Sequence, residues 1–167
     1  MLTSRLGVDG SYGVDLNRNY AGSENGDPLG EWSVGASLVP SDVDYCGEYA
    51  FSEPETRIVR DFVVAHPDIT AAISFHTYAE LILYPYGYTY EDQPADMTLD
   101  DLLAFRKLSG DMAASNGYIA QQASDLYTTS GDTVDWLYGE AGTDWFLVHS
   151  EDQTPDWTSP PETKTAI

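Results

Sequence analysis

The sequence predicts an α/β domain in which a partial mixed sheet is flanked by helices. Two observations support this fold class. Short apolar runs of strand length alternate with segments of helical periodicity, and Pro or Gly residues separate them. The chain has 167 residues, which suits one domain or a piece of a larger one. We therefore expect residues 1–167 to form a single domain.

The first predicted helix begins near Ser52. A serine followed three positions later by Glu55 forms a capping box, and Pro54 suits a first helical turn. Pro67 ends the pattern. Residues 21–50, before this helix, are rich in Gly, Ser, Asp and Pro and indicate a long irregular loop. Four apolar residues of the helix have the spacing of a core-facing stripe: Ile58, Val59, Phe62 and Val63.

Six more elements, strands and helices, are expected along the rest of the chain. Residues 69–75 are short and mostly apolar, as in a strand that is buried on both faces. Residues 81–84 predict a second strand, and Pro85 stops it. A long helix is expected from Thr98 to Asn116, with Asp101 in its first turn and Gly117 as its terminator. Three further elements and a tail follow: a strand at 118–123, a short helix at 133–140, a strand at 145–148 and a Pro-rich tail after 150.

The net charge of the chain limits the classes of partner that it can bind. Acidic residues number 28 and basic residues 7, so the formal net charge is −21. We therefore expect no nucleic-acid partner and no anionic membrane, because both need a cationic surface. No secretory signal and no membrane-spanning run is visible, and the single Cys46 excludes a disulfide framework and a Cys-rich zinc site. Such acidity favours a protein that works in concentrated salt, where ions screen the repulsion between its charges. The alternative is an ordinary acidic extracellular protein.

Three side chains are candidates for chemistry. His76 closes the strand at 69–75, where ligands of α/β sheets bind, so it is either a metal ligand or a structural histidine. Arg18 lies beside Asn17 in a polar loop, and it either grips a carboxylate or forms a structural salt bridge. Tyr127 lies on a Gly- and Ser-containing loop, and it either covers a pocket or packs half-buried.

Four segments, in this order, resemble the zinc carboxypeptidases of the carboxypeptidase A type, peptidase family M14. Together they cover residues 11–142, the later part of that family's catalytic domain, and residues 143–167 form a divergent strand and tail. The resemblance implies that the fold is the carboxypeptidase fold without its N-terminal part. The segments are residues 13–20 (GVDLNRNY), 50–56 (AFSEPET), 74–78 (SFHTY) with 83–87 (LYPYG), and 126–136 (LYTTSGDTVDW).

The resemblance implies a role for each matching position. His76 corresponds to a zinc ligand, and Asp15 to the carboxylate that orients a zinc-bound histidine. Asn17 and Arg18 correspond to the pair that binds the C-terminal carboxylate of a peptide. Tyr127 corresponds to the mobile catalytic tyrosine that covers the substrate. Two residues fall in the segment that lines the side-chain pocket, where Val134 suits an apolar C-terminal residue and Asp132 a basic one.

The implied activity is hydrolysis of the C-terminal peptide bond with Zn²⁺ as cofactor and peptide or protein C-termini as partners. The family's H-x-x-E motif, which supplies two further zinc ligands, is not found in the sequence. Counting from Trp136 to the general-base glutamate reaches His149, with Glu151 two residues beyond. We therefore expect a truncated carboxypeptidase-type domain that is inactive as written. The alternative is a non-catalytic module that binds peptide C-terminal carboxylates.

Overall fold

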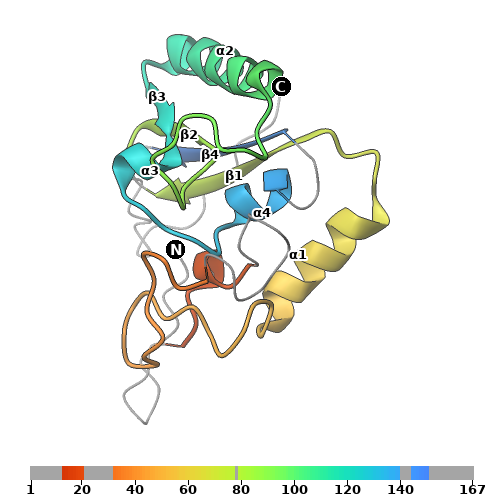
Figure 1. The fold of residues 1–167 in the computed structure, drawn as a ribbon, viewed down its shortest axis with the longest axis vertical. Coiled ribbons are helices and arrows are strands. Elements are labelled where there is room, and N and C mark those ends of the chain that lie inside the picture. The colour runs from red at the N-terminus through yellow and green to blue at the C-terminus, as the bar shows by residue number, and fades with distance from the viewer. Residues whose placement is uncertain (1–12, 21–31, 78, 140–143, 151–167) are drawn as a thin grey trace, which may run out of the picture.

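The computed structural model describes residues 13–20, 32–77, 79–139 and 144–150. A small sheet forms the middle layer, with α2 on one side and α1 and α4 on the other (Figure 1). None of the helices within the described ranges is long and apolar enough to cross a membrane. The elements, in chain order, are η1 (Leu16–Arg18), α1 (Pro54–Ala65), β1 (Ala71–Thr77), β2 (Leu81–Tyr84), α2 (Leu99–Asn116), β3 (Ile119–Gln122), α3 (Ala123–Leu126), α4 (Thr133–Gly139) and β4 (Asp144–Ser150).

The four strands form one mixed sheet in the order β1-β4-β2-β3. β1 pairs with β4 in parallel, and β2 pairs with β3 in parallel. β4 and β2 are antiparallel, with Leu81 opposite His149. β4, the last of the described strands, therefore lies in the middle of this four-stranded sheet, and β1 lies at one edge of it. The mixed α/β sheet expected from the sequence is confirmed.

The face of the sheet under α2 holds the main hydrophobic core. All four residues of β2 are buried. Ile82 and Tyr84 pack in this core with Leu102 and Phe105 of α2, whereas Leu81 and Leu83 pack in a separate cluster with Val134 of α4. The helix begins as predicted, because the Thr98 side chain accepts a hydrogen bond from the Asp101 backbone N–H. It ends at Gly117, whose φ of 81° is the left-handed C-cap conformation. This helix and this strand are encoded by local signals and a clear apolar pattern.

The expectation that β1 is buried on both faces is wrong. Exposure alternates along the strand, and Ile73 and Phe75 are 44% and 73% exposed on one face. The opposite face carries Ala72, Ser74 and His76, which are partly buried. The cause is position: among the described strands only β4 pairs with β1, and α2 packs over the β2–β3 side of the sheet.

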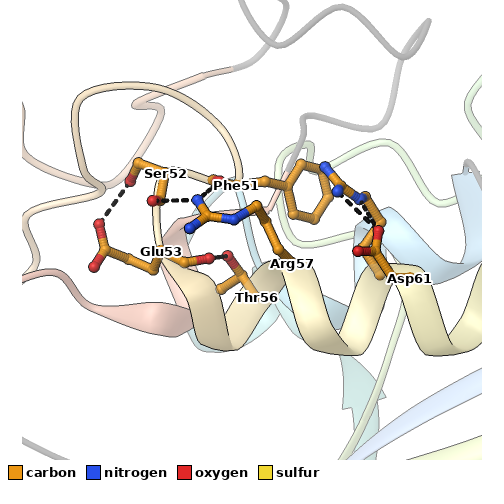
Figure 2. Close-up of polar contacts among 7 residues, drawn as sticks. Phe51, Ser52, Glu53, Thr56, Arg57 and Asp61 are labelled. Atoms are coloured by element: carbon orange, nitrogen blue, oxygen red, sulfur yellow. Dashed lines mark hydrogen bonds and ion pairs between the residues drawn. The ribbon is translucent and has the colours of Figure 1, made fainter.

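The start and the face of α1 also differ from the expectation. The helix begins at Pro54 with Glu53 as its N-cap, and no side chain of its own caps it. The Ser52 hydroxyl donates to the Glu53 carboxylate, and Arg57 donates to the Phe51 and Ser52 carbonyls (Figure 2). The predicted capping box is therefore absent: the N-cap is Glu53, and the Ser52 hydroxyl binds the Glu53 side chain and does not cap a helical N–H. Of the four apolar residues expected to face a core, Val63 is buried, whereas Ile58, Val59 and Phe62 are exposed.

Asn19, which lies 34 residues before Glu53, replaces the missing cap. Its Oδ1 accepts from the Glu53 backbone N–H at 3.2 Å and from the Thr56 hydroxyl at 2.7 Å. Its Nδ2 donates to the carbonyls of Cys46 and Tyr49 and to the Ser52 hydroxyl. Asn19 is fully buried, so this one amide joins three segments of the chain.

The connections are mostly as expected. Residues 32–53 contain no helix or strand beyond one isolated bridge between Ser37 and Tyr45, in agreement with the predicted loop. The four-residue helix α3 was not predicted, because its sequence (ASDL) is too short to show periodicity. Residues 21–31 of the predicted loop and the tail after 150 lie outside the described residues.

Candidate functional site

A cavity of about 380 Å³ opens where the carboxyl end of β1 meets the 13–20 segment and the loop after α3. The carboxyl ends of strands are where ligands of α/β sheets bind, and the cavity lies at such an end. Three of the sequence-predicted residues, His76, Arg18 and Tyr127, are brought together in its wall although they come from distant parts of the chain. The lining residues are Asp15, Leu16, Asn17, Arg18, Tyr20, Ser74, Phe75, His76, Tyr127 and Thr133.

The 13–20 segment owes its shape to Asp15. Its side chain accepts from the Asn17 backbone N–H at 3.0 Å and so caps the 3-10 turn η1. Its own N–H donates to the Tyr45 carbonyl at 2.8 Å, which ties the segment to the loop at 32–53. The turn that follows places Asn17 and Arg18 side by side on the cavity wall.

Arg18 is nearly buried, with 7% of its surface exposed. Its Nη1 donates to the Asn17 carbonyl at 2.7 Å, and its Nη2 donates to the Tyr127 hydroxyl at 3.2 Å. Its Nε–H is buried and has no hydrogen-bond partner. No carboxylate of the described residues lies within ion-pair distance of the guanidinium. A buried arginine with an unused donor is unfavourable in isolation and is suited to an anionic ligand.

Asn17 is held by the start of α4. Its Oδ1 accepts from both the backbone N–H and the hydroxyl of Thr133, at 3.1 and 2.9 Å. Since the oxygen has these two donors, the amide nitrogen Nδ2 is the end that remains for a ligand. The orientation of Asn17 is therefore fixed by a residue 116 positions away.

Gly131 allows the loop before α4 to approach the 13–20 segment. Its φ is +70°, and a Cβ at this position would collide with the backbone carbonyl of Arg18. The Gly131 carbonyl accepts from the Tyr20 N–H at 2.9 Å. Only glycine has both this conformation and this clearance, so Gly131 sets the spacing between Arg18 and the α4 loop.

Tyr127 is the exposed member of the site. It follows α3 in an extended conformation, and 48% of its surface is exposed. Besides the hydroxyl contact, its ring centroid lies 5.7 Å from the Arg18 guanidinium carbon. A half-exposed tyrosine held at a loop by one side-chain hydrogen bond is able to move with little loss of packing.

His76 lies at the carboxyl end of β1, partly buried, and lines the same cavity. The resemblance implies that it binds zinc, and catalytic zinc sites use three protein ligands. Among the residues that the structure describes, no group of three His, Cys, Asp or Glu side chains is arranged to hold a metal ion. These residues therefore do not fit a complete zinc site.

A second cavity of about 30 Å³ adjoins the first. It shares Asn17, Arg18, His76 and Tyr127 with the larger cavity and extends further inward. Its remaining lining residues are Leu83, Ala123, Leu126, Thr129 and Asp132. Val134 does not line either cavity. It packs in a core cluster with Leu81 and Leu83.

Two buried carboxyl groups lie at the start of α4. Asp135 accepts from the N–H groups of Gly87 and Tyr88, at 2.8–3.0 Å, and Asp132 accepts from the Asp135 N–H at 2.8 Å. Burial raises the pKa of the Asp132 carboxyl. Burial, followed by the charge of Asp132, raises the pKa of the Asp135 carboxyl well above its ordinary value. Burial therefore disfavours the charged form of both carboxyl groups behind the site.

Sequence reasoning did not identify the supporting roles of Thr133 and Thr129. Thr133 was considered only as a helix start, yet it orients Asn17. The Thr129 hydroxyl is buried without a hydrogen-bond partner next to the smaller cavity. A run of hydroxyl residues at 128–130 is the one visible signal, and the same run is common in ordinary turns.

Comparison with known proteins bears directly on this site. The zinc carboxypeptidase family matches residues 3–155, a wider range than the four segments recognised in the sequence. The chain belongs to the zinc carboxypeptidase family. Carboxypeptidase A1 of Rattus norvegicus is 38% identical over 133 residues, which cover 77% of this chain and 29% of the relative. Carboxypeptidase B of Bos taurus is 36% identical over 131 residues, with 77% and 30% coverage.

Solved structures agree with this family assignment. Bovine thrombin-activatable fibrinolysis inhibitor, in complex with a tick carboxypeptidase inhibitor, matches with a TM-score of 0.66 and 31% identity. The match covers 86% of this chain and 47% of that one. The carboxypeptidase fold expected from the sequence is therefore confirmed. The chain spans about three-tenths of the length of the curated relatives it matches.

Proposed function

We propose that this chain binds the free C-terminal carboxylate of peptides in the larger cavity. The single observation that supports this function most strongly is the buried Arg18 guanidinium, whose Nε–H has no hydrogen-bond partner. A planar guanidinium recognises a carboxylate through two parallel, charge-assisted hydrogen bonds. Recognition of the terminal carboxylate selects chain ends, which is the specificity of an exopeptidase.

Each residue of the cavity has a separate role in this proposal. Arg18 neutralises the carboxylate, and Asn17 donates from its Nδ2 because Thr133 occupies its Oδ1. Tyr127 gives up its contact with the Arg18 Nη2 and covers the bound chain end. This exchange leaves a donor on Arg18 available for the second carboxylate oxygen. Water is excluded as the ring closes, which strengthens the ion pair.

We propose that the chain by itself binds peptides without hydrolysing them. Members of the family use zinc, which as a bound Lewis acid lowers the pKa of its water ligand. Among the described residues that line the cavity, His76 is the imidazole that could bind zinc, and Asp15 lies in the same wall to orient a metal-bound imidazole. One imidazole does not hold catalytic zinc. We expect zinc titration of the purified chain to give no tight stoichiometric binding and no release of C-terminal residues.

Titration of a free-acid peptide and its C-terminal amide tests the carboxylate site. Tryptophan fluorescence of the full chain is measured with both peptides. We expect the acid to bind about 10- to 100-fold more tightly, which corresponds to the roughly 1.5–3 kcal/mol of hydrogen bonds to a charged group. Arg18→Gln removes this preference. Arg106→Gln is the matched control, because Arg106 pairs with Asp92 at the surface and leaves the preference intact. Equal binding of acid and amide excludes the proposal.

A further inference from the structure

One long side of β1 is covered by no other described strand. β4 pairs with β1 residue by residue from Ala71 to Thr77, and the opposite side of β1 is an edge of the sheet. Among the described residues, no backbone hydrogen bond outside the sheet involves residues 71–75. An edge strand presents a row of N–H and C=O groups that have no partner in the sheet. This edge therefore offers main-chain donors and acceptors to a ligand.

The larger cavity lies directly against this strand. Its wall includes Ser74, Phe75 and His76, three consecutive residues of β1. Successive side chains of a strand point to opposite faces of the sheet, so a cavity that touches all three residues also lies against the backbone between them. Because β4 occupies the other long side of β1, the backbone groups within reach of a ligand are those of the free edge. The carboxylate site is therefore continuous with this edge.

The position of Arg18 determines the direction in which a bound peptide continues. Arg18 lines the cavity at the carboxyl end of β1, so a peptide whose C-terminal carboxylate it holds extends back toward Ala71. Such a peptide runs parallel to β1. A parallel strand rises about 3.3 Å per residue, so about four residues lie beside the stretch 71–74 when the last residue occupies the cavity.

The side chains along the edge indicate which peptides fit it. Ile73 and Phe75 are 44% and 73% exposed on one face of β1. Side chains that are adjacent across two paired strands stabilise the pairing when both are apolar. The opposite face of the same stretch carries the small residues Ala72 and Ser74, and residues 71–77 contain no Asp, Glu, Lys or Arg. The edge therefore favours an uncharged peptide with apolar residues at alternate positions.

We propose that the free edge of β1 binds the ligand peptide as an added parallel strand. Main-chain hydrogen bonds to residues 71–74 hold about four residues that precede the C-terminal one, and every second side chain of the peptide packs beside Ile73 and Phe75. This inference rests on the proposed carboxylate site, since Arg18 holds the end of the peptide. Strand addition gains affinity from the main chain, so the ligand is an extended peptide rather than a free amino acid or a dipeptide.

A series of peptide lengths tests the added strand. N-acetylated free-acid peptides of two, five and eight residues, with the same C-terminal residue and alternating Val and Thr before it, are titrated into the full chain by tryptophan fluorescence. We expect the five-residue peptide to bind about 10-fold more tightly than the two-residue peptide, because each net hydrogen bond outweighs the ordering of its residue only slightly. The eight-residue peptide gains nothing further, since the edge ends at Ala71.

N-methylation of the five-residue peptide distinguishes strand pairing from other contacts. One backbone amide at a time is methylated, which removes its donor. In an added strand only every second residue directs its N–H toward β1, and the others direct it to solvent. We expect methylation at alternate positions to reduce the affinity to that of the two-residue peptide, and methylation at the positions between them to change it by less than about 2-fold.

Ile73→Ala tests the apolar contact on the protein side. Ile73 is exposed and does not line the carboxylate cavity. We expect this variant to weaken binding of the five-residue peptide by about 2- to 5-fold and to leave the two-residue peptide unchanged, since one cross-strand contact is lost. Ile119→Ala is the matched control, because Ile119 is 62% exposed on β3 at the other edge of the sheet. The control changes the affinity of neither peptide.

Two results overturn the inference while the proposed function stands: equal binding of the two- and five-residue peptides, or a loss on N-methylation that does not alternate along the peptide. In both cases the two-residue peptide still binds more tightly as the acid than as the amide. Loss of that preference at every peptide length overturns the proposed function itself.

Discussion

β1 and β2 have similar sequences and opposite surroundings. Both are short, mostly apolar strands of the same sheet, and both were predicted from the sequence. Every residue of β2 is buried, because the strand lies between β4 and β3 in the sheet and packs against residues of both α2 and α4. Every second residue of β1 is exposed. The apolar sequence determines that a strand forms. How much of the strand is buried depends on the strands and helices that lie beside it, and the apolar sequence does not encode these neighbours.

The helices repeat this difference. α2 begins at its own Thr98, ends at its own Gly117 and buries Phe105 in the core. α1 depends on the distant Asn19 for its first hydrogen bonds and exposes most of its apolar stripe. The part of the molecule around α2 and β2 is therefore organised locally, and the part around α1 and β1 depends on contacts made far along the chain.

The largest expected contrast is between two phenylalanines. Phe105 is fully buried and packs against the rings of Tyr84 and Tyr138. Phe105→Ala is expected to lower the free energy of unfolding by about 3–5 kcal/mol, since it removes core contacts and leaves a cavity. Phe75→Ala, at the exposed position of β1, is expected to change it by less than about 0.5 kcal/mol. Urea unfolding measures both, and similar losses would show that the face of β1 is covered in solution.

The two helix starts give the next contrast. Asn19→Ala removes the acceptor of the Glu53 N–H and one of the two acceptors of the Thr56 hydroxyl, and it removes the donor to the buried Cys46 carbonyl. We expect a loss of about 2–4 kcal/mol in the free energy of unfolding, because each buried group left unpaired costs about 1–3 kcal/mol. Thr98→Ala removes one exposed cap of α2 and is expected to cost about 1 kcal/mol. An equal loss for the two variants would contradict the non-local role of Asn19.

The last expected effect is the pH dependence of stability that comes from the buried acids Asp132 and Asp135. Their pKa values are raised in the folded chain, so the folded state binds more protons than the unfolded state above about pH 3.9. Their stabilising contribution is therefore present at low pH and is lost as the pH rises through the folded pKa values. The slope is at most about 1.4 kcal/mol per pH unit for each proton.

Urea unfolding between about pH 5 and 8 measures this slope. Asp135→Asn is expected to flatten it, because the uncharged amide no longer titrates. Asp111→Asn is the matched control, since Asp111 is exposed at the surface and pairs with Lys107. A slope that is unchanged in Asp135→Asn would remove the buried pair as the cause.

The sequence predicted those features that depend on a few neighbouring residues. The limits of α2 follow from Thr98 and Gly117, and β2 follows from an apolar run that ends at Pro85. The proximity of Arg18 and Tyr127, which are 109 residues apart, was expected only through the family resemblance. No local pattern specifies that contact.

Other features were beyond sequence reasoning for physical reasons. The exposure of Ile58 and Phe75 depends on which elements cover them, and periodicity carries no information about that. The helix cap from Asn19 is invisible because its partners lie more than 30 residues away. The sequence predicted Ser52 as the cap of α1, but in the structure the Ser52 hydroxyl donates to the Glu53 carboxylate. The expectation that neither His149 nor Glu151 supplies the general base stays a prediction, since Glu151 lies outside the described residues.

The edge position of β1 has a consequence for solubility. Soluble proteins usually protect an edge strand with lysine, proline or a bulge, and Ala71–Thr77 contains neither lysine nor proline. Long-range repulsion between molecules of net charge −21 is then the main obstacle to strand-to-strand pairing at this edge. Conditions that weaken the repulsion, such as acidification, remove that protection. Ile73→Lys is the simplest way to restore it, because Ile73 is exposed on β1 and does not line the peptide cavity.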